Sequence, residues 1–326
     1  MTTDHAPVPV TGQKTVGRSG LTARLLRPAG PGERRAGVFS KAVLLALIIL
    51  WLLPTIGLLV TSLRDPGEAA SSGWWTVFTG SGGGLKIDNY ADVLGETAGG
   101  STLAEAFTNS FVVAVPATII PILIAAFAAY AFSWMEFRGR EIFFILFVGL
   151  LVVPLQVAFI PIIELQAILD RNVFSLLPGD PAIQGTFTAI WLAHAGFGMP
   201  LAVYLLRNYI GSLPREIIES AKVDGASHFQ IFWRLIIPLS VPALAAFAIF
   251  QFLWTWNDFL VALIMLDSLR VGQVTTTYLA QLQGTFGESV HLLTAGAFIT
   301  MVVPLIVFFS MQRFFVRGLT AGSVKG

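Results

Sequence analysis

Long apolar segments alternate with short polar loops along most of this chain. Six segments contain enough consecutive apolar residues to cross a bilayer as a helix, which takes about 20 residues. They cover residues 42–63, 107–134, 142–163, 186–206, 239–266 and 292–312. Every segment contains proline, which membrane helices tolerate where neighbouring groups satisfy the carbonyls that proline frees. The pattern predicts an all-α membrane protein with six transmembrane helices.

The flanking segments suggest how the chain is organised. Residues 1–38 are rich in Pro, Gly, Thr and Arg, so we expect a disordered cytoplasmic tail. The first apolar segment is too long for a signal peptide, and no clear cleavage site follows it. We therefore expect residues 39–106 to hold a retained first helix and an outer loop with a short surface helix in 85–94. A core with the other five helices then spans 107–316, and 317–326 is a cytoplasmic tail.

Composition supports a membrane protein and narrows its chemistry. Hydrophobic residues make up 55% of the 326 residues and charged residues only 12%, whereas soluble domains have about 25% charged residues. The chain contains no cysteine, which excludes disulfides, thiolate metal sites and cysteine nucleophiles. We find no metal-ligand spacing, paired carboxylates or catalytic triad. The sequence therefore predicts a protein that is not an enzyme and that has neither catalytic residues nor a metal site.

The distribution of basic residues predicts the topology. With the N-terminus inside, sixteen of the 20 Lys and Arg residues fall in inner segments. The outer loops then hold only Arg64, Lys86, Arg171 and Arg270. Because basic residues favour the cytoplasmic side, both termini and the 212–238 loop are predicted to be cytoplasmic.

Ionisable residues are rare inside the predicted spans. Asp258 lies in the fifth span, His194 lies in the fourth, and Glu164 lies at the end of the third. Carriers driven by protons or sodium usually need buried carboxylates or relay chains. A stand-alone carrier or channel is therefore a disfavoured alternative, and we interpret His194 as an interhelical hydrogen-bonding residue.

The 212–238 loop has the pattern of two short helices joined at a glycine. Gly225 suits the turn, and Ser227 and Gln230 have capping-box spacing, so a second helix should start near His228 and end at Pro238. Few basic residues and two membrane-attached ends argue against DNA binding, so we expect no nucleic-acid partner. An amphipathic hairpin that only rests on membrane lipid remains an alternative.

The same loop resembles the EAA loop of bacterial ABC importer permeases. The family pattern is E-A-A, three residues, G, nine residues, then I-x-L-P. Ser220 replaces the first alanine and Leu235 replaces the isoleucine. The matching positions and their neighbours, to which the resemblance assigns contact with an ATPase, are Glu219, Ser220, Ala221, Asp224, Gly225, Phe229, Leu235, Ile237 and Pro238.

Further stretches resemble the carbohydrate-uptake branch, close to the maltose-type second permease. They are residues 109–110, 128–132, 256–259 and 313–326, and the resemblance covers about residues 85–326. It implies type I ABC importer permease architecture in the bacterial inner membrane. The implied partners are a second homologous permease, an ABC ATPase dimer and an extracytoplasmic solute-binding protein. ATP would bind the ATPase, so this chain needs no cofactor. An ABC permease for a non-sugar solute is the alternative.

Aromatic and polar residues cluster near the end of the fifth span. Aromatic faces and hydrogen-bonding side chains suit a sugar, so we assign a substrate pathway to Trp254, Trp256, Asn257 and Asp258. The alternative is helix packing with an interfacial aromatic belt, in which Asp258 pairs with the sister permease.

Overall fold

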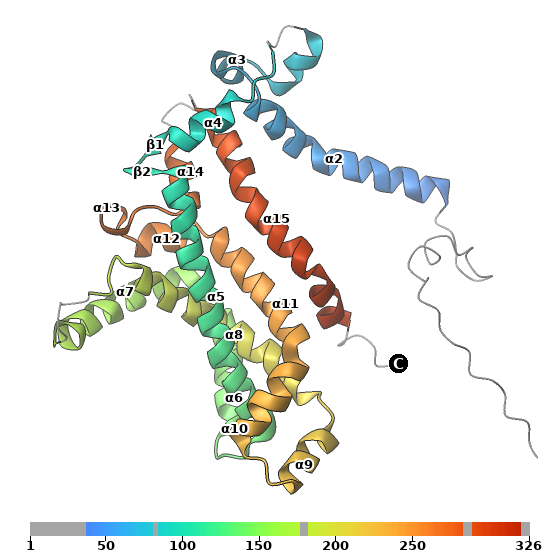
Figure 1. Cartoon of the computed structure of the whole chain (residues 1–326), viewed down its shortest axis with the longest axis vertical. Coiled ribbons are helices and arrows are strands. Elements are labelled where there is room, and N and C mark those ends of the chain that lie inside the picture. Colours follow the sequence, from blue (N-terminus) through green and yellow to red (C-terminus); the bar gives the residue numbers. More distant parts are fainter. Residues whose placement is uncertain (1–36, 81–83, 177–181, 283–288, 321–326) are drawn as a thin grey trace, which may run out of the picture. The chain divides into compact units, whose positions relative to one another are not determined.

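The computed structural model describes residues 37–80, 84–176, 182–282 and 289–320, and side chains only to Gln312 in the last range (Figure 1). The chain divides into two units, Met1–Pro54 and Thr55–Gly326. In the first unit, the described part is the beginning of helix α2 (Val38–Ser62), which continues into the second. Most of the predicted N-terminal tail and the last six residues lie outside the described ranges.

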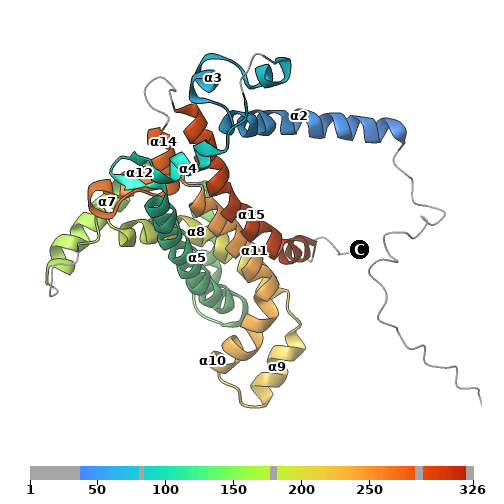
Figure 2. The same cartoon turned by 45° about the horizontal axis from the view of Figure 1, so that its top comes forward.

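Four long helices form the body of the second unit. Helix α5 (Leu103–Trp134) packs against α8 (Phe187–Gly211) and α11 (Ile237–Trp256), and α11 packs against α15 (Val290–Thr320), as Figures 1 and 2 show. Small buried residues let the backbones approach closely, as is common between membrane helices. On α5 and α8 these include Ala114, Ala117, Ala125, Ala129, Ala193 and Ala202.

Helix α5 stays continuous although it contains Pro116 and Pro121. A proline removes the hydrogen bond to the carbonyl four residues earlier. The Val112 carbonyl accepts a hydrogen bond from Trp191 Nε1 at 2.8 Å, and the Ala117 carbonyl accepts one from Gln251 Nε2 at 3.2 Å. Side chains of α8 and α11 thus satisfy both freed carbonyls, which also ties the three helices together.

The third predicted span is not one continuous helix in the structure. Among the described residues, five helices are long and apolar enough to cross a membrane, and a sixth span requires counting a bent pair as one. The pair comprises α6 (Arg140–Gly149) with a short 3-10 turn, η2 (Leu150–Val152), and then α7 (Leu155–Asn172), and it bends by 111°. The bend falls at Pro154, because proline drives the residue before it into extended geometry.

The fifth predicted span also differs from the structure at both ends. Helix α10 (His228–Ile231), the π-helical turn η4 (Phe232–Ile236) and α11 form one continuous run, His228–Trp256. The second loop helix therefore does not end at Pro238. The π turn shifts the hydrogen-bond register, with Ile237 N bonded to the Phe232 carbonyl, so the run passes Pro238. At its other end the run stops before Asn257 and Asp258, and α12 (Leu260–Met265) follows as a separate helix.

Short elements cover the end of the bundle where α5 begins. The predicted helix in 85–94 is confirmed as α4 (Asp88–Gly95). Arg64 is fully buried there, and its guanidinium donates to the Ser72 carbonyl at 2.8 Å and to Thr76 Oγ1 at 3.2 Å. The short elements at this end are α3 (Pro66–Ser71), η1 (Trp74–Thr79), α4 (Asp88–Gly95), β1 (Thr97–Ala98), β2 (Ser101–Thr102), α13 (Ser268–Val271) and α14 (Thr275–Leu282). A further short element, η3 (Phe174–Leu176), packs against α7.

Candidate functional site

The predicted glycine turn lies between α9 (Arg215–Val223) and α10. Gly225 has φ +77°, a conformation that side chains with a Cβ rarely adopt. Ala226 N bonds to the Ala221 carbonyl and Gly225 N bonds to the Lys222 carbonyl, both at 3.0 Å. This pair of hydrogen bonds is the Schellman motif that ends many helices. The sequence therefore located the break between the two loop helices correctly.

The predicted capping box at the start of α10 is also confirmed. Gln230 N donates to Ser227 Oγ at 3.3 Å, and Ser227 N donates to Gln230 Oε1 at 2.8 Å. Two backbone amides that a helix start leaves unpaired are thereby satisfied. The loop is thus a defined pair of helices.

One face of the loop packs into the ends of α5 and α8. Ile218, Ile231, Phe232 and Ile236 are buried and belong to the same hydrophobic core as the final turns of those helices. The Phe232 ring stacks on Phe127 with centroids 4.2 Å apart. The loop is therefore packed against the bundle and does not stand free of it.

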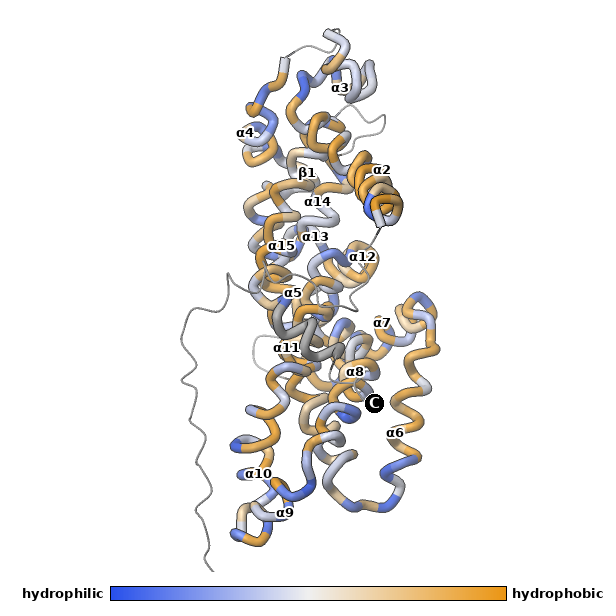
Figure 3. Tube along the Cα trace, turned by 90° about the vertical axis from the view of Figure 1, so that its right-hand side faces the viewer, coloured by the Kyte–Doolittle hydropathy of each residue, from blue (hydrophilic) through white to orange (hydrophobic). Residues whose placement is uncertain are grey.

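The other face of the loop is open. Of the predicted contact residues, Glu219, Ser220, Asp224, Gly225, Phe229 and Pro238 are exposed, and Ala221, Leu235 and Ile237 are half-buried. Phe229 is 68% exposed and Val223 is 87% exposed, although both are large apolar residues. Figure 3 shows polar and apolar residues mixed along α9 and α10 below mostly apolar helices. Val223 was not among the predicted contact residues, and its position beside Asp224 and Gly225 was the available signal.

A second candidate site lies at the break after α11. Trp254, Asn257 and Asp258 line an open cavity of about 700 Å³ together with apolar residues of α11 and Phe308 of α15. Trp256 points elsewhere: it is 4% exposed, and its ring lies 4.8 Å from the Phe111 ring. The structure thus brings three of the four predicted pathway residues to the cavity and places the fourth in an aromatic cluster.

Asp258 connects this cavity to the buried interior. Its Oδ2 accepts a hydrogen bond from Ala262 N at 3.0 Å, at the first turn of α12. The same oxygen lies 3.6 Å from His194 Nε2, and the His194 ring meets Trp254 edge-on at 5.5 Å. His194 is fully buried, and its ring nitrogens have no hydrogen-bond partner within the described part of the chain. The prediction that His194 forms an interhelical hydrogen bond is therefore wrong: its ring lies 3.6 Å from Asp258, in the break between α11 and α12, without a hydrogen bond within the described residues.

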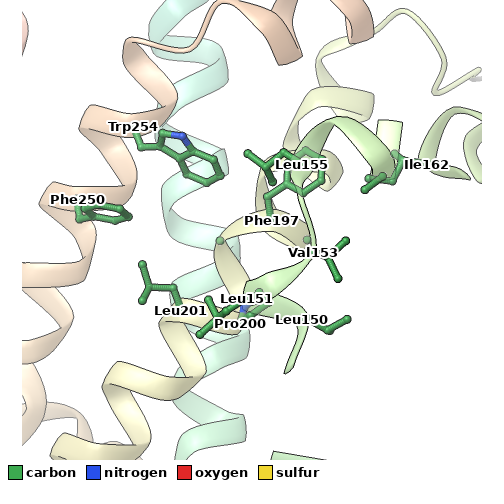
Figure 4. Close-up of a pocket in the computed structure, with 13 residues that line it drawn as sticks. Leu150, Leu151, Val153, Leu155, Ile162, Phe197, Pro200, Leu201, Phe250 and Trp254 are labelled. Atoms are coloured by element: carbon green, nitrogen blue, oxygen red, sulfur yellow. The ribbon is translucent and has the colours of Figure 1, made fainter. Parts of the chain in front are cut away.

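A second, apolar cavity of about 420 Å³ opens beside the bend in the third span (Figure 4). Figure 4 shows Trp254 and Phe250 of α11 facing Phe197 of α8 and Leu155 of α7. Trp254 lines both cavities. Phe250 lines both cavities as well, so the apolar space and the one that contains Asn257 and Asp258 share part of the surface of α11. Within the described ranges, no group of three or more His, Cys, Asp or Glu residues could hold a metal ion.

Five long apolar helices and one bent pair, among the described residues, are those of a multi-pass α-helical membrane protein. The family model for the inner membrane component of binding-protein-dependent transport systems matches residues 120–321. The chain belongs to this family, and it is a permease of the ABC importer type.

The chain is similar to named permeases along most of its length. It is 53% identical to the osmoprotective compounds uptake permease protein GgtD of Synechocystis sp., covering 86% of this chain and 90% of GgtD. It is 43% identical to the alpha-glucoside transport system permease protein AglG of Rhizobium meliloti, covering 86% and 95%.

A solved structure shares the fold. It is a bacterial ABC transporter involved in the import of the acidic polysaccharide alginate, which matches 84% of this chain and 94% of its own chain with a TM-score of 0.63. At 21% sequence identity, this likeness supports the permease fold alone.

Proposed function

We propose that this chain is the permease subunit of an ATP-driven importer for a sugar or oligosaccharide and forms half of its translocation pathway. The main support is the α9–α10 loop, which is anchored to the bundle on one face and open on the other. AglG is named for alpha-glucosides, and the alginate importer has also been solved with an alginate pentasaccharide-bound periplasmic protein. The proposed partners are a second homologous permease, an ABC ATPase dimer and an extracytoplasmic solute-binding protein. ATP binds and is hydrolysed on the ATPase.

The proposed orientation follows the basic residues. The inner side receives both termini and the α9–α10 loop, where Arg215, Lys222 and Arg234 lie. This side is the cytoplasm, where the ATPase has access to ATP. The α3–α4 and α13–α14 segments then face the solute-binding protein.

The open face of the loop supplies the contact with the ATPase. Val223 and Phe229 would enter an apolar cleft on that subunit, since exposed large apolar groups gain most from burial. Glu219 would add a polar contact, and Gly225 would set the angle between the two helices. Closure of the ATPase dimer would move the loop, and the bundle would rock between inward-open and outward-open states.

The solute pathway runs past the break after α11. Asn257 and Asp258 offer hydrogen-bonding groups and Trp254 offers an aromatic face, a combination that suits a sugar ring. Trp256 supports this wall by packing behind it. The second permease would close the open side of the cavity.

The coupling proposal is tested by substituting Gly225 with valine in the assembled importer. A β-branched residue at φ +77° is strained, so the turn should deform. We expect solute uptake in proteoliposomes to fall while ATP hydrolysis continues. Gly100→Val is the matched control, because Gly100 has φ +82° and open space around it but lies in the β1–β2 hairpin.

Normal uptake by Gly225→Val would refute the coupling role of the loop. Uptake by this chain without any ATPase would instead favour the stand-alone carrier. An alpha-glucoside and a non-sugar osmoprotectant are each tested as competitors of solute uptake, which distinguishes the two solute classes suggested by the names of AglG and GgtD. We expect the alpha-glucoside to compete, and competition by the osmoprotectant alone would refute the sugar assignment.

A further inference from the structure

We infer that the hydrogen bond between Tyr130 and His228 transmits movement of the α9–α10 loop to helix α5, which makes both residues positioning residues for energy coupling. Tyr130 lies near the end of α5, and His228 is the first residue of α10. The Tyr130 hydroxyl lies 2.8 Å from His228 Nδ1, although 98 residues separate them in the chain. This inference rests on the proposed coupling role of the loop.

The Tyr130–His228 hydrogen bond differs in kind from the other contacts between the loop and the bundle. Within the described ranges, it is the one side-chain hydrogen bond that joins residues 214–236 to the rest of the bundle. Tyr130 is 4% exposed, whereas His228 is exposed. Loss of the Tyr130 hydroxyl would therefore leave His228 free to bond to water, and no other described side-chain hydrogen bond would join residues 214–236 to the bundle.

The other contacts between loop and bundle are apolar. Phe232 stacks on Phe127, and its ring lies 5.6 Å from the Tyr130 ring. Apolar contacts stabilise burial without fixing direction, whereas a hydrogen bond weakens steeply when its geometry changes. The stacked rings thus hold the loop against α5, and the Tyr130 hydroxyl determines which direction of α10 movement is transmitted to α5.

Helix α5 connects this contact to the opposite end of the bundle. Asn109, near the start of α5, donates from Nδ2 to the carbonyls of Val271 and Gln273 at 3.3 and 2.9 Å. Ser110 Oγ lies 3.0 Å from Thr275 Oγ1. At 1.5 Å per residue, Tyr130 and Asn109 are about 30 Å apart along the helix. A shift of α10 would therefore reach the α13–α14 segment through a single rigid element.

Tyr130→Phe tests the link, because it removes only the hydroxyl. The assembled importer, with its ATPase and solute-binding protein, is reconstituted in vesicles, and uptake and ATP hydrolysis are measured together. We expect solute moved per ATP to fall roughly fivefold, which corresponds to one lost hydrogen bond. Tyr204→Phe is the matched control, because Tyr204 lies on α8, is 39% exposed and has no hydrogen bond in the described structure.

His228 variants test the partner. His228→Ala should uncouple like Tyr130→Phe, and the double variant should be no worse than either single variant, because both remove the same bond. His228→Asn keeps a hydrogen-bonding group near the Nδ1 position and should recover part of the coupling. Thermal midpoints should match those of Tyr204→Phe.

Two results would overturn the inference. One is unchanged transport per ATP in Tyr130→Phe while Gly225→Val uncouples, which removes this link and leaves the coupling role of the loop in place. The other is a fall in uptake and ATP hydrolysis together, with a lower thermal midpoint, which indicates a purely structural bond. If Gly225→Val also stays fully coupled, the proposed function of the loop fails and the link fails with it.

Discussion

A methyl group at Gly198 would test how closely α8, α11 and α5 pack around one buried amide. Gln251 is fully buried, and its Nε2 donates to the carbonyls of Ala117 at 3.2 Å and His194 at 3.3 Å. A Cβ at Gly198 would lie 2.5 Å from Gln251 Oε1 and 2.7 Å from Nε2. Because both carbonyls hold the amide, it cannot move aside without losing a bond.

The overlap should outweigh the gain in helix propensity. Overpacking a close-packed interior costs about 1–3 kcal/mol. Each interhelical hydrogen bond lost in a membrane costs about 0.6 kcal/mol on average and up to about 2 kcal/mol. Alanine favours a helix interior over glycine by about 1 kcal/mol. We therefore expect Gly198→Ala to lower the free energy of unfolding by about 1–3 kcal/mol.

The assay is the thermal midpoint of the purified protein in detergent. At about 2–4 °C per kcal/mol, Gly198→Ala should lower the midpoint by about 2–12 °C. Gly196→Ala is the matched control, because it lies in the same helix and nothing lies within 4 Å of its added Cβ. In a Gln251→Ala background the overlap disappears, so Gly198→Ala should then cost less. A Gly198→Ala midpoint equal to that of Gly196→Ala, or strictly additive effects with Gln251→Ala, would contradict this reasoning.

Three further predictions concern other contacts. Trp191→Phe should lower the thermal midpoint, because it leaves the Val112 carbonyl, which Pro116 frees, without a partner. Adding Pro116→Ala returns a backbone amide and should restore the midpoint; a midpoint that stays low would refute the role of Trp191. Arg64→Met should make the 64–95 segment more sensitive to protease, because the buried guanidinium holds that segment through Ser72 and Thr76. Lys86→Met, at an exposed residue, is the control, and equal cleavage of the two variants would contradict the role of Arg64. The Lys86 ammonium lowers the pKa of Asp65, so the stability from this ion pair is present above the ordinary carboxyl pKa and is lost as the pH falls through the lowered pKa. An Asp65 pKa that is unchanged in Lys86→Met would refute this pairing.

Local chemistry made part of this protein predictable. The length and composition of the apolar segments are enough to indicate membrane helices, since the bilayer sets the length. Gly225 and the Ser227–Gln230 pair act within a few residues of chain, so the turn and the capping box could be read directly. These are features whose energies depend on neighbours in sequence.

The side chains facing the cavity were only partly predictable. Trp254 and Trp256 are two residues apart, and only the packing shows that the first lines the cavity and the second joins an aromatic cluster. The contact of His194 with Asp258 likewise depends on how α8 meets the break after α11. Sequence pattern identifies the residue types, whereas the direction of each side chain depends on helix contacts.

By itself, the sequence determined the membrane class, the helical segments and the glycine turn of the loop. Only the tertiary structure decided which prolines interrupt a helix. The chain bends at Pro154 but passes Pro116 and Pro121, because Trp191 and Gln251 satisfy the two freed carbonyls in α5. Those donors lie 79 and 134 residues away from the carbonyls they satisfy. No local pattern can reveal such partners, since only the folded bundle brings them together.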